Sequence, residues 1–322
     1  MKLVTLALSA ALGLTAQQPR IANARVETRA AGNLQATFQS AVAAAELPVW
    51  LAYAVPAVKG HGESCYGNNG LTRTGPVMLE GSTTLVVLFR LEHHAVDKMR
   101  NFYSDCQLDA GGLPVILLTG VRPAESVALL ETRTAIEAIA MHDDPAADTA
   151  LERFGNPSQP VKVREKLGFA LAAFRGKKGF ELLKRLNTNE ADDRVREKNM
   201  FAFSVSKEPQ AIDSLIDAAK NDKSPKVRSQ ALFWMAHKAG ERQRAAIKDA
   251  VENDPETEVK KKAVFAVSQL PQDQAIPMLI ELSRSNKNQE VRKQAMFWLG
   301  QSKDKRALTY FQEVLVAPAH GR

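Results

Sequence analysis

The stretch Asp254-Pro-Glu-Thr-Glu-Val-Lys-Lys-Lys-Ala-Val-Phe265 decides the fold, because its pattern recurs along the C-terminal half of the chain. Its valine belongs to a column of valines spaced 32 residues apart, and a phenylalanine stands six residues after each one. The valines are Val163, Val195, Val227, Val259 and Val291, and the phenylalanines are Phe169, Phe201, Phe233, Phe265 and Phe297. Five identical residues in one register indicate a tandem repeat.

Each 32-residue unit predicts two helices joined by a short loop. Positions four and eight after the valine are mostly apolar, as one face of a helix requires, and glycine or proline interrupts each unit, as at Pro209, Gly240 and Pro271. A hairpin of this size cannot bury its apolar face alone, so neighbouring units must stack. The residues five positions before the valines are Ser158, Glu190, Asp222, Asp254 and Asn286. Four of them are good N-caps for the first helices.

The pattern from Asp254 to Phe265, together with Val291-Arg-Lys-Gln-Ala-Met-Phe-Trp-Leu-Gly300, resembles short bacterial HEAT repeats of the PBS-lyase type. The resemblance covers residues 156–317 and implies an α-solenoid of five helical hairpins. Similar repeats occur in phycobilin lyases and in uncharacterised secreted bacterial proteins, and most serve as adaptors. Residues 124–155 are helix-like but lack the valine and phenylalanine of the register, so we expect a degenerate capping repeat there.

A basic column follows the valines, and it has two interpretations. The column is Arg164, Arg196, Arg228, Lys260 and Arg292. It could form a cationic ladder for an anionic partner, or each cation could pair with acids and helix-end carbonyls between neighbouring units. We favour the structural interpretation, because Asp222 and Asp254 lie nearby in the sequence.

The phenylalanine column also has two interpretations. At about 100° per residue, the sixth position after the valine falls almost opposite the apolar cluster of the first helix. If the rings face outward, they form a stripe with Trp234 and Trp298 that could bind a partner, since exposed apolar surface marks interaction sites and aromatic residues are their usual anchors. Alternatively, the helix is rotated so that the rings pack into the core.

Residues 17–123 lack the repeat and predict a small β-rich or α+β domain. Segments 49–55, 83–89, 96–103 and 114–119 have the composition of strands, and residues 33–46 have that of a helix. Cys65 and Cys106 both fall here, and an even pair in an oxidising compartment predicts a disulfide. Metal ligation or two free thiols are the alternatives.

The first sixteen residues, MKLVTLALSAALGLTA, have one early lysine, an apolar stretch and a small-residue ending. This layout is typical of a signal peptide cleaved after Ala16, with Ala24 as a second possible cleavage point. No other stretch reaches about 18 apolar residues, so we expect no transmembrane segment in the mature chain. The protein is therefore expected to be secreted or periplasmic.

Polar residues that could support chemistry are sparse. Glu92, His93, His94 and Asp97 are the densest set, and they lie between two predicted strands, where exposed turn residues are expected. A metal or base role would need His61 or Asp105 as well. The chain has neither a P-loop nor a G-x-G-x-x-G or G-x-S-x-G motif.

Composition limits the functional classes further. The chain of 322 residues is 45% hydrophobic and 25% charged, as in globular proteins, and carries a net charge of +7. Acidic and basic residues alternate without a continuous cationic track, so nucleic acid is not an expected ligand.

The sequence thus predicts a mostly α protein, with an α-solenoid at 156–317 preceded by a small β-rich domain and followed by a tail at 318–322. We expect an extracytoplasmic scaffold that binds one or more proteins and needs no cofactor or metal. The alternative is an enzyme or a lyase-like protein with a polar site in the N-terminal domain.

Overall fold

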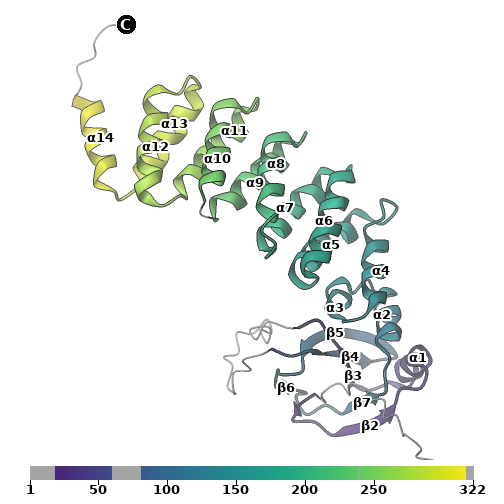
Figure 1. The fold of residues 1–322 in the computed structure, drawn as a ribbon. Coiled ribbons are helices and arrows are strands. Elements are labelled where there is room, and N and C mark those ends of the chain that lie inside the picture. The colour runs from purple at the N-terminus through teal and green to yellow at the C-terminus, as the bar shows by residue number, and fades with distance from the viewer. Residues whose placement is uncertain (1–18, 60–80, 239, 317–322) are drawn as a thin grey trace, which may run out of the picture. The chain divides into compact units, whose positions relative to one another are not determined.

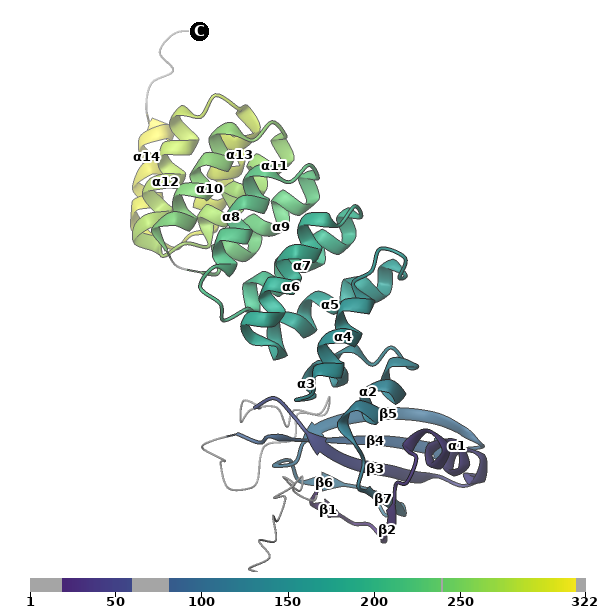
Figure 2. The same ribbon diagram turned by 45° about the vertical axis from the view of Figure 1, so that its right-hand side comes forward.

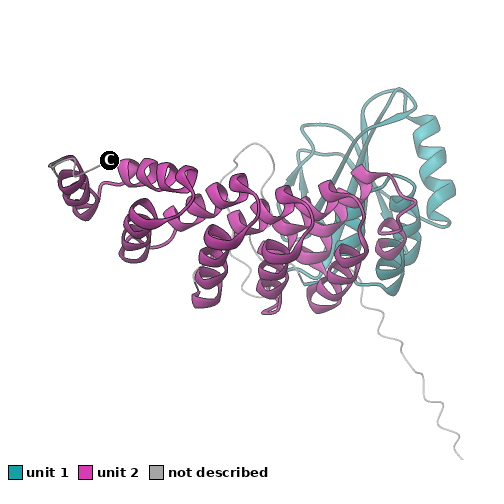
Figure 3. Ribbon diagram, turned by 90° about the horizontal axis from the view of Figure 1, so that it is seen from above, with its two compact units in different colours: residues 1–150 teal, residues 151–322 magenta. Residues whose placement is uncertain are grey.

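The structure, a computed structural model, describes residues 19–59, 81–238 and 240–316. The chain divides into two compact units, residues 1–150 (unit 1) and 151–322 (unit 2), which Figure 3 shows in two colours. The predicted signal peptide at 1–16, His61 and Cys65 lie outside the described residues.

Unit 1 is built on a mixed sheet (Figure 1). Its strands, in spatial order, are β2 (Val26–Ala30), β7 (Val115–Thr119), β3 (Val49–Pro56), β4 (Thr84–Glu92) and β5 (Ala95–Tyr103). β2, β7 and β3 run parallel, whereas β3, β4 and β5 are antiparallel neighbours. Two short strands, β1 (Ile21–Ala22) and β6 (Leu108–Asp109), pair separately. The four strands predicted from sequence are confirmed, whereas β2 was not predicted, because all five of its residues are exposed.

Both faces of this sheet are covered, since successive side chains of a strand point to opposite sides. Helix α1 (Leu34–Ala44) packs on β4 and β5, and its Phe38 ring meets Phe89 of β4 edge to face at 4.9 Å between centroids. The opposite face carries a second buried cluster, formed by Ala52, Val86, Leu88, Cys106, Leu108, Ala110, Val115 and Leu117. The small domain therefore has its own core.

Residues 124–155 form three short helices rather than one degenerate repeat. These are α2 (Pro123–Glu131), α3 (Ile136–Met141) and α4 (Pro145–Phe154). The division between the units falls inside α4, so α2 and α3 belong with the sheet. Ser126 of α2 attaches them, because its Oγ lies 2.9 Å from Tyr53 Oη of β3 and 2.8 Å from His142 Nε2 just after α3. The division between the two units therefore lies near residue 150, within the segment 124–155 that was predicted as a capping repeat.

Unit 2 contains helical hairpins in the register that the valine column predicted (Figures 1 and 2). The first helices are α5 (Val161–Phe174), α7 (Asp193–Val205), α9 (Pro225–Ala236), α11 (Thr257–Ser268) and α13 (Gln289–Gln301). The second helices are α6 (Gly176–Asn189), α8 (Ala211–Asn221), α10 (Glu241–Asn253), α12 (Gln272–Ser285) and α14 (Lys305–Val316). Each first helix packs against the next first helix along the chain. The α-solenoid preceded by a β-rich domain is thus confirmed.

The apolar columns of the repeat form the core between successive hairpins. The valines from the second hairpin onward are at most 3% exposed, and only Val163 of the first hairpin is partly exposed. At the eighth position, none of the five residues Leu171, Phe203, Met235, Val267 and Leu299 exceeds 1% exposure. Burying one such side chain contributes roughly 1.5–3 kcal/mol. Stacking therefore stabilises hairpins that could not fold singly.

Three arginines of the basic column each link the loop before their own first helix to the acid that ends the second helix of the same hairpin. In Arg196, Nε and Nη2 donate to the two carboxylate oxygens of Asp222 at 2.8 and 3.0 Å. Its Nη1 donates to the carbonyls of Glu190 and Ala191 in the loop before its own helix. The same bidentate geometry joins Arg164 to Glu190 and Arg228 to Asp254, each acid lying 26 residues after its arginine. These contacts are those that a structural role requires.

The acids of these links are not N-caps, contrary to the sequence expectation. The N-caps of the first helices lie two residues later, at Pro160, Asp192, Ser224, Glu256 and Asn288. Asp222 instead ends α8 and accepts a hydrogen bond from the backbone N–H of Ser224 at 2.8 Å. Burial alone would raise the pKa of Asp222, but the Arg196 and Ser224 hydrogen bonds outweigh it and hold that pKa below its ordinary value. The Asp222 carboxylate lies two residues before the N-cap Ser224 and also faces the guanidinium of Arg196 on α7.

One link of the column differs from the arginine links. Lys260 stands where the others have arginine, and Asn286 stands 26 residues later where they have an acid. Lys260 Nζ donates to the carbonyls of Val251 and Glu252. The fourth hairpin therefore has neither the arginine nor the acid, and it lacks a bidentate ion pair of this kind.

Replacing Arg196 by glutamine is expected to destabilise unit 2 by about 3 kcal/mol, because it leaves the Asp222 carboxylate buried without its cation. The side chains of this pair are 5% and 9% exposed. Urea unfolding followed by circular dichroism measures the change.

The matched control is Arg242→Gln, which removes an ion pair with Asp213 whose side chains are 68% and 50% exposed. This variant should lose less than about 1 kcal/mol. Equal losses in the two variants would contradict a structural role for the buried link.

Candidate protein-binding surface

The phenylalanine column lies at the surface of the first helices. Phe297 is 53% exposed and Phe201 is 37% exposed, while Phe169, Phe233 and Phe265 are partly buried. The contrast on α7 is direct, because Phe203, two residues after Phe201, is 1% exposed. Of the two interpretations that the sequence left open, these exposures favour the outward-facing stripe.

With two tryptophans, the column forms a continuous series of ring contacts along all five hairpins, which we call the aromatic ladder. In order of contact, its members are Phe169, Phe201, Trp234, Phe233, Phe265, Trp298 and Phe297. Successive ring centroids are 5.8, 4.9, 4.9, 6.0, 5.2 and 5.0 Å apart. The predicted residues are thus brought together into one surface.

The aromatic ladder repeats with a period of two hairpins. Phe169 stacks on Phe201 at an interplanar angle of 6°, and Phe201 meets Trp234 at a tilt. Sixty-four residues later, Phe233 stacks on Phe265 at 7°, and Phe265 meets Trp298 at a tilt. The cause is the seventh position after the valine, which is tryptophan in the third and fifth hairpins and alanine in the others. The surface therefore presents one aromatic triad twice.

Two neighbours of the aromatic ladder, His237 and Phe174, were not predicted from the sequence. The His237 ring lies 4.8 Å from that of Phe233, and its Nδ1 is 2.9 Å from the Phe233 carbonyl oxygen. Phe174 meets Phe169 edge to face at 6.3 Å. His237 follows Phe233 by four residues, a spacing that places two side chains on one helical face. This spacing could have identified it.

Glu92 and Asp97 both pair with Arg90, whereas His93, His94 and Asp105 do not come together. His93 and His94 form the turn of the β4–β5 hairpin, with φ of 50° and 57°, as a two-residue type I′ turn requires. Asp105 follows the opposite end of β5, about 30 Å away along a nine-residue strand. Among the described residues, no group of three or more His, Cys, Asp or Glu side chains could hold a metal ion.

A buried hydrogen-bonded trio was not foreseen. Tyr53, Ser126 and His142 are each 0% exposed, and His142 Nδ1 lies 2.7 Å from the Ala138 carbonyl oxygen. Desolvation raises the pKa of Tyr53 well above its ordinary value. Although a serine beside a histidine is a pairing that can form a nucleophile, a substrate cannot reach side chains with no exposed surface. The trio therefore attaches helices to the sheet.

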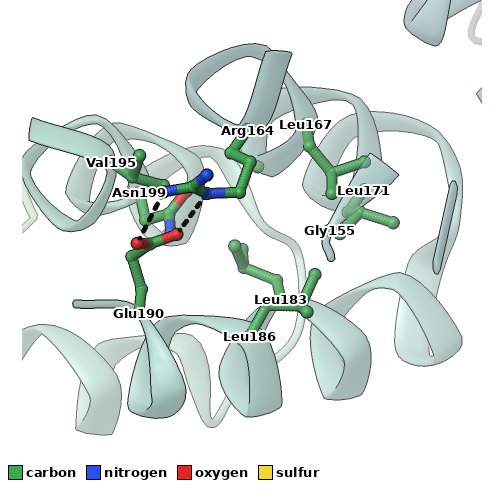
Figure 4. A pocket seen from close by; sticks show the side chains of 10 residues that line it. Gly155, Arg164, Leu167, Leu171, Leu183, Leu186, Glu190, Val195 and Asn199 are labelled. Carbon is green, nitrogen blue, oxygen red and sulfur yellow. Dashed lines mark hydrogen bonds and ion pairs between the residues drawn. The ribbon is translucent and has the colours of Figure 1, made fainter. Parts of the chain in front are cut away.

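Unit 2 also contains a cavity between α5, α6 and α7, of about 10 Å³ (Figure 4). Leu167, Leu183 and Leu186 line it beside the Arg164–Glu190 pair. Asn199, which is 3% exposed, replaces the apolar residue of the repeat here, and its Oδ1 has no hydrogen-bond partner among the described residues. A volume of this size holds at most one water molecule, so it is not a substrate site.

Cys106 lies in the buried cluster on the second face of the sheet and is 4% exposed. Because Cys65 lies outside the described residues, the disulfide between them stays a prediction.

Phe201 and Phe203 of α7 differ in exposure, so replacing them should change the free energy of unfolding by different amounts. Phe201→Ser removes a surface ring and is expected to cost less than about 1 kcal/mol. Phe203→Ser opens a cavity in the core and should cost at least about 3 kcal/mol. Urea unfolding of the two variants checks this, and a large loss for Phe201→Ser would place its ring in the core.

Comparisons with known proteins agree with the hairpin geometry. A family model for HEAT repeats matches residues 212–295 and 244–322. No curated protein matches the chain. Among solved structures, a chain from the complex of CpcE and CpcF of phycocyanin lyase from Nostoc sp. PCC7120 is similar at 23% identity, with a TM-score of 0.36, over 49% of this chain and 100% of that chain. Human deoxyhypusine hydroxylase in complex with glycerol is similar at 11% identity, with a TM-score of 0.29, over 61% of this chain and 91% of that chain. The described residues include no helix long and apolar enough to cross a membrane. The matched residues coincide with stacked hairpins of unit 2, so this part of the chain carries HEAT repeats.

Proposed function

We propose that the protein is a scaffold that binds another protein through the aromatic ladder. The observation that carries this proposal is the unbroken series of partly exposed rings along five hairpins, with Phe297 and Phe201 53% and 37% exposed. Contiguous apolar surface of this kind marks interaction sites. Large aromatic side chains supply much of the binding energy at protein interfaces.

The stacking within the aromatic ladder supports the proposal. Rings that already pack against one another lose little conformational freedom when a partner covers them, which lowers the entropic cost of binding. The hairpins fix the spacing of the rings, because each ring belongs to a first helix that packs against the first helix of a neighbouring hairpin. A preformed strip of rings therefore suits docking of an apolar face of another protein.

We also propose that the protein acts outside the cytoplasm with Cys65 bonded to Cys106. The signal-peptide pattern of residues 1–16 and the even number of cysteines support this. The burial of Cys106 in a core cluster is compatible with a structural disulfide.

The cysteine pairing can be tested on protein isolated from the organism's envelope and denatured without reductant. A maleimide reagent should label neither cysteine before reduction and both cysteines after it, and the mature N-terminus should be Gln17 or Arg25. Cys106→Ser is the control, because it leaves one thiol that labels without reduction. Labelling of both cysteines in unreduced wild-type protein, or an N-terminus at Met1, would contradict the proposal.

The binding proposal is tested by capture from envelope extract on immobilised protein, with quantification by mass spectrometry. Phe201→Ser/Phe297→Ser should retain the fold, since both rings are exposed, and should lose at least about tenfold of the specific partner.

The matched control is Leu308→Ser/Leu315→Ser, which removes two apolar side chains of α14 that are 59% and 82% exposed and lie outside the aromatic ladder. This control should capture the partner as wild type does. Equal capture by all three proteins would exclude the aromatic ladder as the docking surface.

A further inference from the structure

A column of lysines runs beside the aromatic ladder. Lys166, Lys198 and Lys262 each stand three residues before a ladder phenylalanine in their hairpins, and all three are exposed. Residues three apart on a helix are surface neighbours, with Cβ atoms about 5–6 Å apart. None of the three lysines has an ion-pair partner within the described parts of the chain. The column therefore places positive charge, without an ion-pair partner among the described residues, beside the rings of the first, second and fourth hairpins.

The remaining charges near the rings do not cancel this column. Basic side chains three, four or seven residues before the ladder phenylalanines outnumber the acidic ones at the same positions. The basic residues are Lys162, Lys166, Arg194, Lys198, Lys226, Lys261, Lys262 and Lys293, and the acidic residues are Glu165, Glu197, Glu258 and Glu290. Two of the acids are already paired, Glu258 with Lys261 at 3.0 Å and Glu290 with Lys293 at 2.9 Å. Arg194 is also paired, with Asp192.

The orientation of the rings adds to the positive character of the surface. Phe169 and Phe201 are parallel within 6°, and Phe233 and Phe265 within 7°, so the rings of each pair are stacked with an offset. Stacking uses the ring faces and leaves the ring edges out of that contact. The edge of an aromatic ring carries the positive end of its quadrupole and favours contact with acceptor oxygens.

We infer that the segment docking on the aromatic ladder is an acidic peptide, with apolar side chains flanked by Asp or Glu on the side of Lys166, Lys198 and Lys262. This inference rests on the proposed scaffold function and names the chemistry of its partner. An anionic lipid surface has a similar charge. It fits less well, because Phe169, Phe233 and Phe265 are partly buried, and Glu165 and Glu197 lie on the same face.

The probes are two synthetic 16-residue amphipathic peptides with the same apolar face, one flanked by glutamates and the other by lysines. Isothermal titration calorimetry with the purified protein should show binding of the glutamate peptide at least about tenfold tighter than that of the lysine peptide. The affinity for the glutamate peptide should fall as salt is raised, because exposed charge pairs are screened.

The decisive variant is Lys166→Gln/Lys198→Gln/Lys262→Gln, which removes the column and keeps every ring. It should weaken binding of the glutamate peptide by about tenfold, the sum expected for three exposed charge pairs. The matched control is Lys184→Gln/Lys220→Gln/Lys305→Gln, which removes the same charge from exposed positions of α6, α8 and α14. This control should bind as wild type does.

The outcomes separate the inference from the proposed function. Equal binding of the two peptides, or equal weakening by the two lysine variants, overturns the acidic partner. In that case, loss of peptide binding in Phe201→Ser/Phe297→Ser still supports the aromatic ladder as the docking surface. Binding that does not change in the phenylalanine variant counts against both proposals. Binding of neither peptide overturns the acidic partner and leaves the capture experiment to decide the docking surface. Sedimentation of the protein with phosphatidylglycerol vesicles, reduced only by the column variant, would assign the charge to a membrane instead.

Discussion

Burial of the valine and eighth-position columns between successive hairpins is the interaction on which the C-terminal unit depends. Each hairpin has too little apolar surface to form a core alone, and it becomes stable only when its first helix packs against those of its neighbours. Val227, Val259 and Val291 are fully buried in this way. The arginine links act at one end of each hairpin, since Arg196 of α7 and Asp222 at the C-terminal end of α8 lie 2.8 Å apart. The spacing of the surface rings follows from this stacking as well.

The register of the repeat was predictable because burial selects the same side chains every 32 residues. The strands of residues 49–56 and 84–92 were predictable for a similar reason, since they are runs of buried β-branched and aromatic side chains. β2 was missed because Val-Glu-Thr-Arg-Ala is exposed throughout and carries no burial pattern. The helices at 123–141 were assigned to the solenoid because their attachment to the sheet passes through Tyr53, which is distant in sequence.

The candidate site was predictable as a set of residues and not as a surface. Helical periodicity placed the phenylalanines opposite the core of their own helix, yet a solenoid helix has neighbours on several sides, so the rotation of each helix decides exposure. The N-caps were misplaced by two residues for another reason. Asp222 accepts hydrogen bonds from the backbone N–H of Ser224 and from the guanidinium of Arg196, which lies 26 residues earlier on α7. The sequence pattern indicates the hydrogen bond to the backbone N–H but not the ion pair with Arg196.

The duplicated aromatic triad has a consequence for avidity. Phe169, Phe201 and Trp234 recur 64 residues later as Phe233, Phe265 and Trp298, with interplanar angles of the stacked pairs that differ by about one degree. A ligand that carries one recognition motif twice can engage both copies, and its second contact is then governed by the effective concentration that its linker sets. Two weak contacts can combine into lasting attachment in this way, whereas a ligand with one motif would exchange rapidly between two equivalent positions.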